Sequence, residues 1–171
     1  RDIDALTFEG SAGTFWDRGS ETFDSKHRPT PQDYTIAAGL SFLLGDNGKY
    51  IVMLCDPVRR TLSDFMVWGV RRLKVANPKY VAQASDFANH VNHSYAWFMY
   101  CTRELSVTEC AYLEPTMRPR PWISLGLYHV FLKQWKKHFS ESQLMVINSE
   151  EYFKQPKTVL SKVFAFAGLT E

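Results

Sequence analysis

The pattern of apolar and polar residues divides the chain into short apolar runs and longer amphipathic stretches. The short runs have strand length and are bounded by turn residues; they cover residues 5–8, 50–55 and 143–147. The longer stretches space their apolar residues as on one face of a helix; they cover 32–44, 57–76, 79–100, 122–139 and 157–167. Strands that alternate with helices predict an α/β fold, a parallel sheet flanked by crossover helices.

The junction at Asp56-Pro57 carries the first candidate chemistry. Asp56 is suited to cap a helix and Pro57 to occupy its first position, directly after the apolar run 50–55. A helix that starts at the end of a strand offers backbone N–H groups and a positive dipole end to an anion. Arg59 and Arg60 precede Ser63 by four and three residues, so the three can share a helix face. The pattern predicts a phosphate or sulfate site; the alternative is an ordinary strand–helix connection with solvated arginines.

A carboxylate follows the first predicted strand. Glu9 comes after the run 5–8 and before a turn of small residues at 10–13. The carboxyl ends of strands are where open α/β sheets place their ligands, although a surface acid in a turn is the simpler interpretation. The glycines do not form a P-loop, because no Gly-Lys-Ser/Thr follows them.

Length and composition favour one globular domain over residues 1–171. Apolar residues make up 45% and aromatic residues 15% of the 171 positions, a composition typical of folded proteins. A net charge of +2 does not favour bulk nucleic-acid binding. The longest apolar run, 36–44, is too short to cross a membrane. The chain opens on Arg1 without a methionine, so we expect a fragment or a processed form.

Cysteines, histidines and one sequon bear on the compartment and on metal binding. Cys101 and Cys110 lie in a segment that we predict to be a loop, either as a disulfide in an oxidising compartment or as two reduced thiols. We expect Cys55 to be buried and unpaired. Asn92 opens an N-glycosylation sequon, which favours the secretory pathway. The pair His90 and His93 has no third ligand spaced to join it, so we expect no metal site.

Several stretches resemble one known family. They are TFEGSAGTFWD (7–17), YIVMLCDPVRRTLSDF (50–65), the two cysteines at 101 and 110, GLYHVFLKQWKKHF (126–139) and QLMVINSEEY (143–152). In this order they resemble the Golgi carbohydrate sulfotransferases that use 3′-phosphoadenosine 5′-phosphosulfate (PAPS), and most closely the chondroitin and dermatan sulfate branch that contains N-acetylgalactosamine 4-sulfate 6-O-sulfotransferase. The resemblance implies a P-loop-NTPase-like sulfotransferase fold, PAPS as co-substrate, no metal, and a location in the Golgi lumen or outside the cell. It also implies that any membrane anchor lies outside this chain.

The resemblance assigns roles to three residues. Ser63 and Arg60 match the residues that bind the 3′-phosphate of PAPS, and Glu9 matches the general base of related heparan sulfotransferases. Cys55 stands in the same motif where most members carry an arginine, a loss that would weaken a charge-assisted contact by about 1.5–3 kcal/mol. Gly10 replaces a lysine of the heparan enzymes. The family's 5′-phosphosulfate loop and its late C-terminal loop do not occur in residues 1–171, so we expect the fold to be incomplete at both ends.

The sequence leaves three functions to compare. The first is a PAPS-dependent sulfotransferase that acts on a glycosaminoglycan or related glycan, with possible contacts to the anionic sugar from Arg18, Lys26, Arg118 and Arg120. The second is a glycan-binding or interaction protein that keeps the fold and has lost cofactor binding, as Cys55 would allow. The third, a P-loop kinase-like enzyme, is weak because there is neither a Walker lysine nor a magnesium-binding pair.

Overall fold

The computed structural model describes residues 35–113 and 123–169. At its centre lies a two-stranded parallel sheet of β1 (Tyr50–Leu54) and β2 (Leu144–Asn148), in which Val52 lies opposite Val146. The strands are separated by residues 55–143, and helices fill most of that connection, as a parallel pair requires. The predicted α/β fold with a parallel sheet flanked by helices is confirmed. The strand expected at 5–8 lies outside the described residues.

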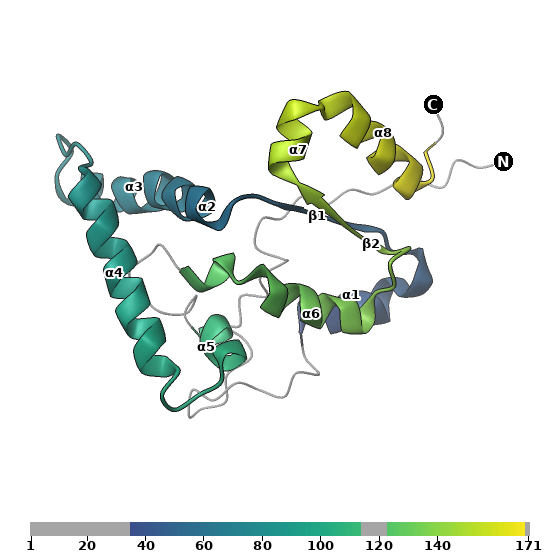
Figure 1. Ribbon diagram of the computed structural model, residues 1–171, viewed down its shortest axis with the longest axis horizontal. Coiled ribbons are helices and arrows are strands. Elements are labelled where there is room, and N and C mark those ends of the chain that lie inside the picture. Colours follow the sequence, from purple (N-terminus) through teal and green to yellow (C-terminus); the bar gives the residue numbers. More distant parts are fainter. Residues whose placement is uncertain (1–34, 114–122, 170–171) are drawn as a thin grey trace.

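Helices cover both faces of the sheet (Figure 1). In that view α7 and α8 lie on one side, and α1 and α6 lie on the other. The remaining helices extend from the carboxyl end of β1 and return to α6. Their bounds are α1 Ile36–Leu44, α2 Pro57–Asp64, α3 Val70–Ala76, α4 Ala84–Cys101, α5 Val107–Leu113, α6 Tyr128–His138, α7 Ser149–Lys154 and α8 Pro156–Ala167, with short 3₁₀ turns at Gly45–Asn47 and Ile123–Gly126 and a π turn at Phe65–Gly69.

The main core lies between α1, α6 and the sheet. Phe131 on α6 is fully buried, and Trp135 and Phe139 follow it toward the start of β2. The ring of Tyr50 packs against Phe139 with centroids 4.1 Å apart and meets Trp135 edge-on at 5.5 Å. Aromatic contacts of this kind contribute beyond the area that they bury. They fix α6 across the sheet, and therefore fix where its first residue lies.

Two predicted helices are shorter than the sequence pattern indicated. The stretch 122–139 is divided, because Leu127 takes a non-helical backbone conformation (φ −80°, ψ 57°) between the 3₁₀ turn and α6. The stretch 79–100 begins only at Ala84, where Gln83 and Asp86 form a capping box. The last helix ends as expected, with Gly168 in the left-handed conformation at φ 75°.

The segment around the two cysteines, which we predicted to be a loop, is irregular only at residues 102–106 and helical on either side. Cys101 is the last residue of α4, and Cys110 lies inside α5. Ser106 and Glu109 cap that helix reciprocally: the Glu109 N–H donates to Ser106 Oγ at 3.2 Å, and the Ser106 N–H donates to Glu109 Oε2 at 2.8 Å. Among the helices described, none combines the length and the apolar character needed to span a bilayer.

Candidate functional site

Both strands end at the same edge of the sheet, and a hollow of about 670 Å³ opens there. In open α/β folds this edge is where ligands bind. Three segments line the hollow: the exit from β1, the exit from β2, and the first residue of α6. Its lining residues are Leu54, Cys55, Asp56, Pro57, Tyr128, Val146, Ile147, Asn148, Glu150 and Glu151.

The turn after β1 is capped as the sequence predicted. Asp56 Oδ1 accepts the Arg59 N–H at 2.9 Å, and the Asp56 carbonyl accepts the Arg60 N–H at 2.9 Å. Pro57 has no N–H, so of the first four helical residues only Val58 keeps an N–H without a partner among the described residues. The carboxylate of Asp56 therefore occupies much of the place that the sequence assigned to an anion, and an anion here must rely on side chains.

Glu150 ties the ends of the two strands together. Its Oε1 accepts the Asp56 N–H at 3.0 Å, and this hydrogen bond is the main reason that the pKa of Glu150 lies below its usual value. Asn148, at the end of β2, caps α7 by accepting the N–H groups of Glu150 and Glu151 at 2.7 and 3.3 Å. The two sides of the hollow are thus held at a fixed separation.

Tyr128 lines the hollow beside the exit from β1. Its Oη lies 4.0 Å from Cys55 Sγ, within hydrogen-bonding distance for sulfur. Burial, and then the neighbouring Cys55 and Asp56, raise the pKa of Tyr128 to about 12, although the positive charge of Arg60 acts in the opposite direction. The phenol therefore keeps its proton at physiological pH and can donate a hydrogen bond.

Gly126 allows this arrangement by its lack of a side chain. A Cβ at this position would lie 2.9 Å from Pro57 Cβ, closer than real Cβ contacts allow. The 3₁₀ turn before α6 thus packs directly against the first residue of α2. This contact sets the distance between Tyr128 and the β1 exit.

The predicted anion-binding residues lie along α2, beyond the lining of the hollow. Arg60 is mostly buried, with a side chain that is 11% exposed; its Nη2 donates to Thr61 Oγ1 at 2.8 Å, and its Nη1 lies 4.0 Å from Asp64 Oδ2. Ser63 is exposed one turn further on. The structure places both on α2, and the positive charge of Arg60 is felt at Tyr128. Their roles toward a ligand remain predictions.

The cysteines are arranged as one disulfide and one free thiol. Cys101 and Cys110 are joined by a disulfide and pack under Trp97, Phe98 and Leu105. Cys55 is free as expected, but it is half-buried at the hollow and not sealed in the core.

The remaining sequence candidates are placed as follows. Asn92 is exposed on α4, whereas Ser94 of its sequon is buried and accepts the Ile123 N–H at 3.1 Å. Within residues 35–113 and 123–169 no three His, Cys, Asp or Glu side chains come together as a metal site would need. Glu9, Arg18, Lys26, Arg118 and Arg120 lie outside the described residues.

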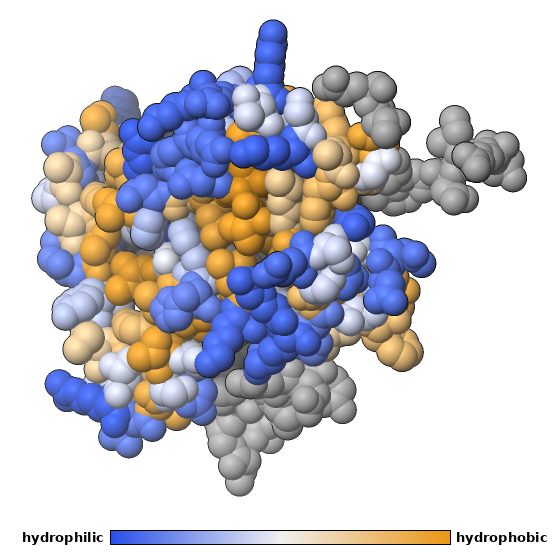
Figure 2. Space-filling model, turned by 45° about the vertical axis from the view of Figure 1, so that its right-hand side comes forward, coloured by the Kyte–Doolittle hydropathy of each residue, from blue (hydrophilic) through white to orange (hydrophobic). Residues whose placement is uncertain are grey.

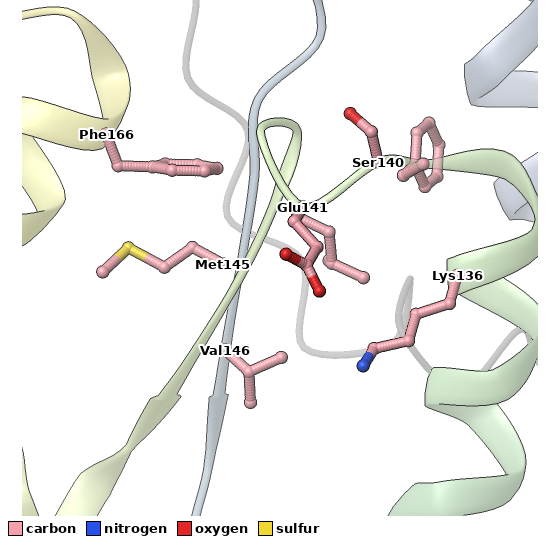
Figure 3. A pocket seen from close by; sticks show the side chains of 8 residues that line it. Lys136, Ser140, Glu141, Met145, Val146 and Phe166 are labelled. Atoms are coloured by element: carbon pink, nitrogen blue, oxygen red, sulfur yellow. The ribbon is translucent and has the colours of Figure 1, made fainter.

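A second, smaller hollow of about 350 Å³ lies at the opposite end of β2 (Figure 3). Lys136 and Glu141 point into the space beside Val146, with Met145 and Phe166 across the strand. Its lining is largely apolar and lies toward the start of β2; it shares Val146 with the first hollow and adds no further group to the site. Apolar residues also reach the surface between polar regions on the face shown in Figure 2. In the described structure, the exposed large apolar residues of the sheet and α8 are Ile51, Met53, Val146, Leu160 and Phe164.

Sequence reasoning missed Tyr128 and Glu150 as parts of the site. Tyr128 belongs to the Gly-Leu-Tyr stretch and Glu150 to the SEEY stretch that carried the family resemblance. Those stretches were the available signal, but nothing in them indicates a contact with the turn after β1. Tyr128 is 73 residues from Cys55 in sequence, and Glu150 is 94 residues from Asp56.

Comparison with known proteins bears on the whole of the described structure. A family model described as "Sulfotransferase domain" matches residues 34–171. Carbohydrate sulfotransferase 15 of Homo sapiens is 27% identical over 162 residues, which are 94% of this chain and 27% of that protein. The Mus musculus protein of that name is 28% identical over the same shares, and that of Nototodarus sloanii is 25% identical over 87 residues, 50% of this chain and 55% of the relative.

The chain spans only about a quarter of the length of its mammalian relatives. No solved structure matches it significantly. The family model nevertheless covers both strands, the turn at Asp56, and the whole lining of the hollow at the strand ends. The chain therefore belongs to the sulfotransferase domain family, and its described residues form an α/β structure around a parallel sheet.

Proposed function

We propose that the protein transfers a sulfuryl group from PAPS to a hydroxyl of a glycosaminoglycan or a related glycan. The observation that supports this most is the hollow at the carboxyl edge of the sheet, beside a capped strand–helix turn in a chain of the sulfotransferase family. The names of the relatives favour a carbohydrate acceptor. The chondroitin and dermatan sulfate branch is the finer assignment that we propose for the acceptor.

Two features of the described residues support PAPS as the co-substrate. The hollow has room for part of a nucleotide, and the charge of Arg60 extends into it. Arg60 and Ser63 would bind the 3′-phosphate from α2, and the Val58 N–H would remain as a backbone donor. Charge-assisted hydrogen bonds of this kind would hold the nucleotide in place.

Glu9 is the proposed general base. The acceptor hydroxyl oxygen attacks sulfur, the bond from sulfur to the bridging phosphate oxygen breaks, and that oxygen keeps the electron pair. The hydroxyl proton passes to the Glu9 carboxylate. A positioned base of this kind contributes about 10²–10⁴-fold to the rate. Arg18, Lys26, Arg118 and Arg120 are proposed contacts to an anionic acceptor.

A location in the Golgi lumen, or outside the cell, goes with this function. The Cys101–Cys110 disulfide supports it, because such bonds persist in oxidising compartments. Glycosylation at the exposed Asn92 is proposed on the same ground.

One observation favours a second function, a sulfotransferase-like protein that binds glycans without catalysis. The lining of the hollow includes three carboxylates, those of Asp56, Glu150 and Glu151, and a cysteine at position 55 in place of a cation. A bisphosphate would meet less positive charge there than the family motif normally provides.

Calorimetric titration with adenosine 3′,5′-bisphosphate separates the two functions. We expect binding to the wild-type protein, and weaker binding by about tenfold or more for Ser63→Ala, since a hydrogen bond to a charged group contributes about 1.5–3 kcal/mol. Ser161→Ala is the matched control, because Ser161 is also an exposed serine in a helix, on α8. No heat with the wild-type protein would favour the binding protein, and unchanged affinity in Ser63→Ala would remove Ser63 from the site.

A further inference from the structure

The negative charges that line the hollow are already engaged by the protein. Asp56 accepts the Arg59 N–H, Glu150 accepts the Asp56 N–H, and Glu151 Oε1 pairs with Lys162 Nζ at 3.1 Å. Asp56 and Glu150 are thus held by backbone hydrogen bonds, and Glu151 is paired with a cation. The described lining, however, contains no lysine or arginine that could replace the cation expected at position 55.

The Tyr128 hydroxyl is the donor that lies next to position 55. It projects from the start of α6 to within 4.0 Å of Cys55 Sγ, and both residues line the hollow. Sulfur is a weak hydrogen-bonding partner, so the hydroxyl loses little by turning to a stronger acceptor. Its raised pKa keeps the proton in place, and the field of Arg60 reaches the same atom.

We propose that Tyr128 Oη donates a hydrogen bond to the 3′-phosphate of the bound nucleotide and takes over, from α6, the role of the missing cation at position 55. This inference rests on the proposed function and adds a residue from a different element to it. The aromatic core under α6 holds Tyr128 in place, because Phe131 and Trp135 are almost fully buried. Gly126 holds the start of α6 against Pro57.

Titration of the wild-type protein and Tyr128→Phe with two nucleotides tests the proposal. Adenosine 3′,5′-bisphosphate carries the 3′-phosphate, and adenosine 5′-monophosphate lacks it. We expect Tyr128→Phe to bind the bisphosphate about tenfold more weakly, as loss of a hydrogen bond to a charged group predicts, and to bind the monophosphate as the wild type does. Tyr95→Phe is the control, since Tyr95 is exposed on α4.

Cys55→Arg provides a second, independent arm. It restores a cation beside Tyr128, so we expect tighter bisphosphate binding and a smaller effect of Tyr128→Phe in the double variant. If wild-type protein binds no bisphosphate, the proposed function fails. If it binds and Tyr128→Phe binds equally well, or weakens both nucleotides alike, only the inference about Tyr128 is wrong. Cys55→Arg without any gain in affinity also contradicts it, even if Tyr128→Phe does not fold.

Discussion

Removing the Cys101–Cys110 disulfide should destabilise the protein by a predictable amount. The two cysteines are nine residues apart and join the end of α4 to α5. Without the crosslink, the unfolded chain gains conformational entropy. For a loop of this size, this gain lowers the free energy of unfolding by about 2.6 kcal/mol at 25 °C. Cys110 is fully buried, so replacement by alanine adds a small packing loss. For a chain of this length, the loss corresponds to a fall in melting temperature of about 5–10 °C.

The assay is thermal and urea unfolding of the Cys101→Ala/Cys110→Ala variant beside the wild type. Cys55→Ala is the control, because it removes a sulfur from a half-buried site without removing a crosslink. We expect the double variant to unfold earlier and the control to change little. Coincident unfolding curves for the double variant and the wild type would refute the reasoning, as would an intact mass that is unaffected by reduction.

Two further predictions concern the walls of the hollow. Gly126→Ala should lower the free energy of unfolding by about 1–3 kcal/mol, because the new Cβ would lie 2.9 Å from Pro57 Cβ. Gly39→Ala on α1 is the control, since its Cβ would meet nothing within 4 Å and should not destabilise the protein. Equal effects of the two substitutions in urea unfolding would contradict the close contact. Burial also raises the pKa of Tyr50, and a hydrogen bond to Asp86 that of Tyr80, so Tyr128 is identified by phenolate absorbance as the component near pH 12 that disappears in Tyr128→Phe. The pKa of Tyr128 is higher in the folded than in the unfolded protein. Its contribution to stability is therefore full below about pH 10 and is lost as the pH rises through 12. If all tyrosines titrate near pH 10, the raised pKa of Tyr128 is wrong.

The junction at Asp56 could be predicted because its signals are local. An Ile- and Val-containing run, a capping aspartate and a proline occupy successive positions, and each favours one backbone conformation. The parallel sheet followed from the alternation of strand and helix patterns. The helix around Cys110 could also have been found, because Ser106 and Glu109 have the spacing of a capping box.

The site itself depends on contacts that a local pattern does not encode. Tyr128 and Glu150 reach the β1 exit from 73 and 94 residues away. The break at Leu127 follows from packing of the 3₁₀ turn against α2, which Gly126 allows. The apolar spacing of 122–139 fits one continuous helix equally well, so periodicity alone does not reveal the break.

Transfer of labelled sulfate from PAPS to a chondroitin acceptor tests the central claim most directly. We predict transfer by the wild-type protein, and a loss of about 100-fold or more for Glu9→Gln with nearly unchanged affinity for adenosine 3′,5′-bisphosphate. Equal activity in Glu9→Gln would remove Glu9 from the mechanism. Bisphosphate binding without transfer to chondroitin or any other glycan offered would contradict the account of this protein as an enzyme.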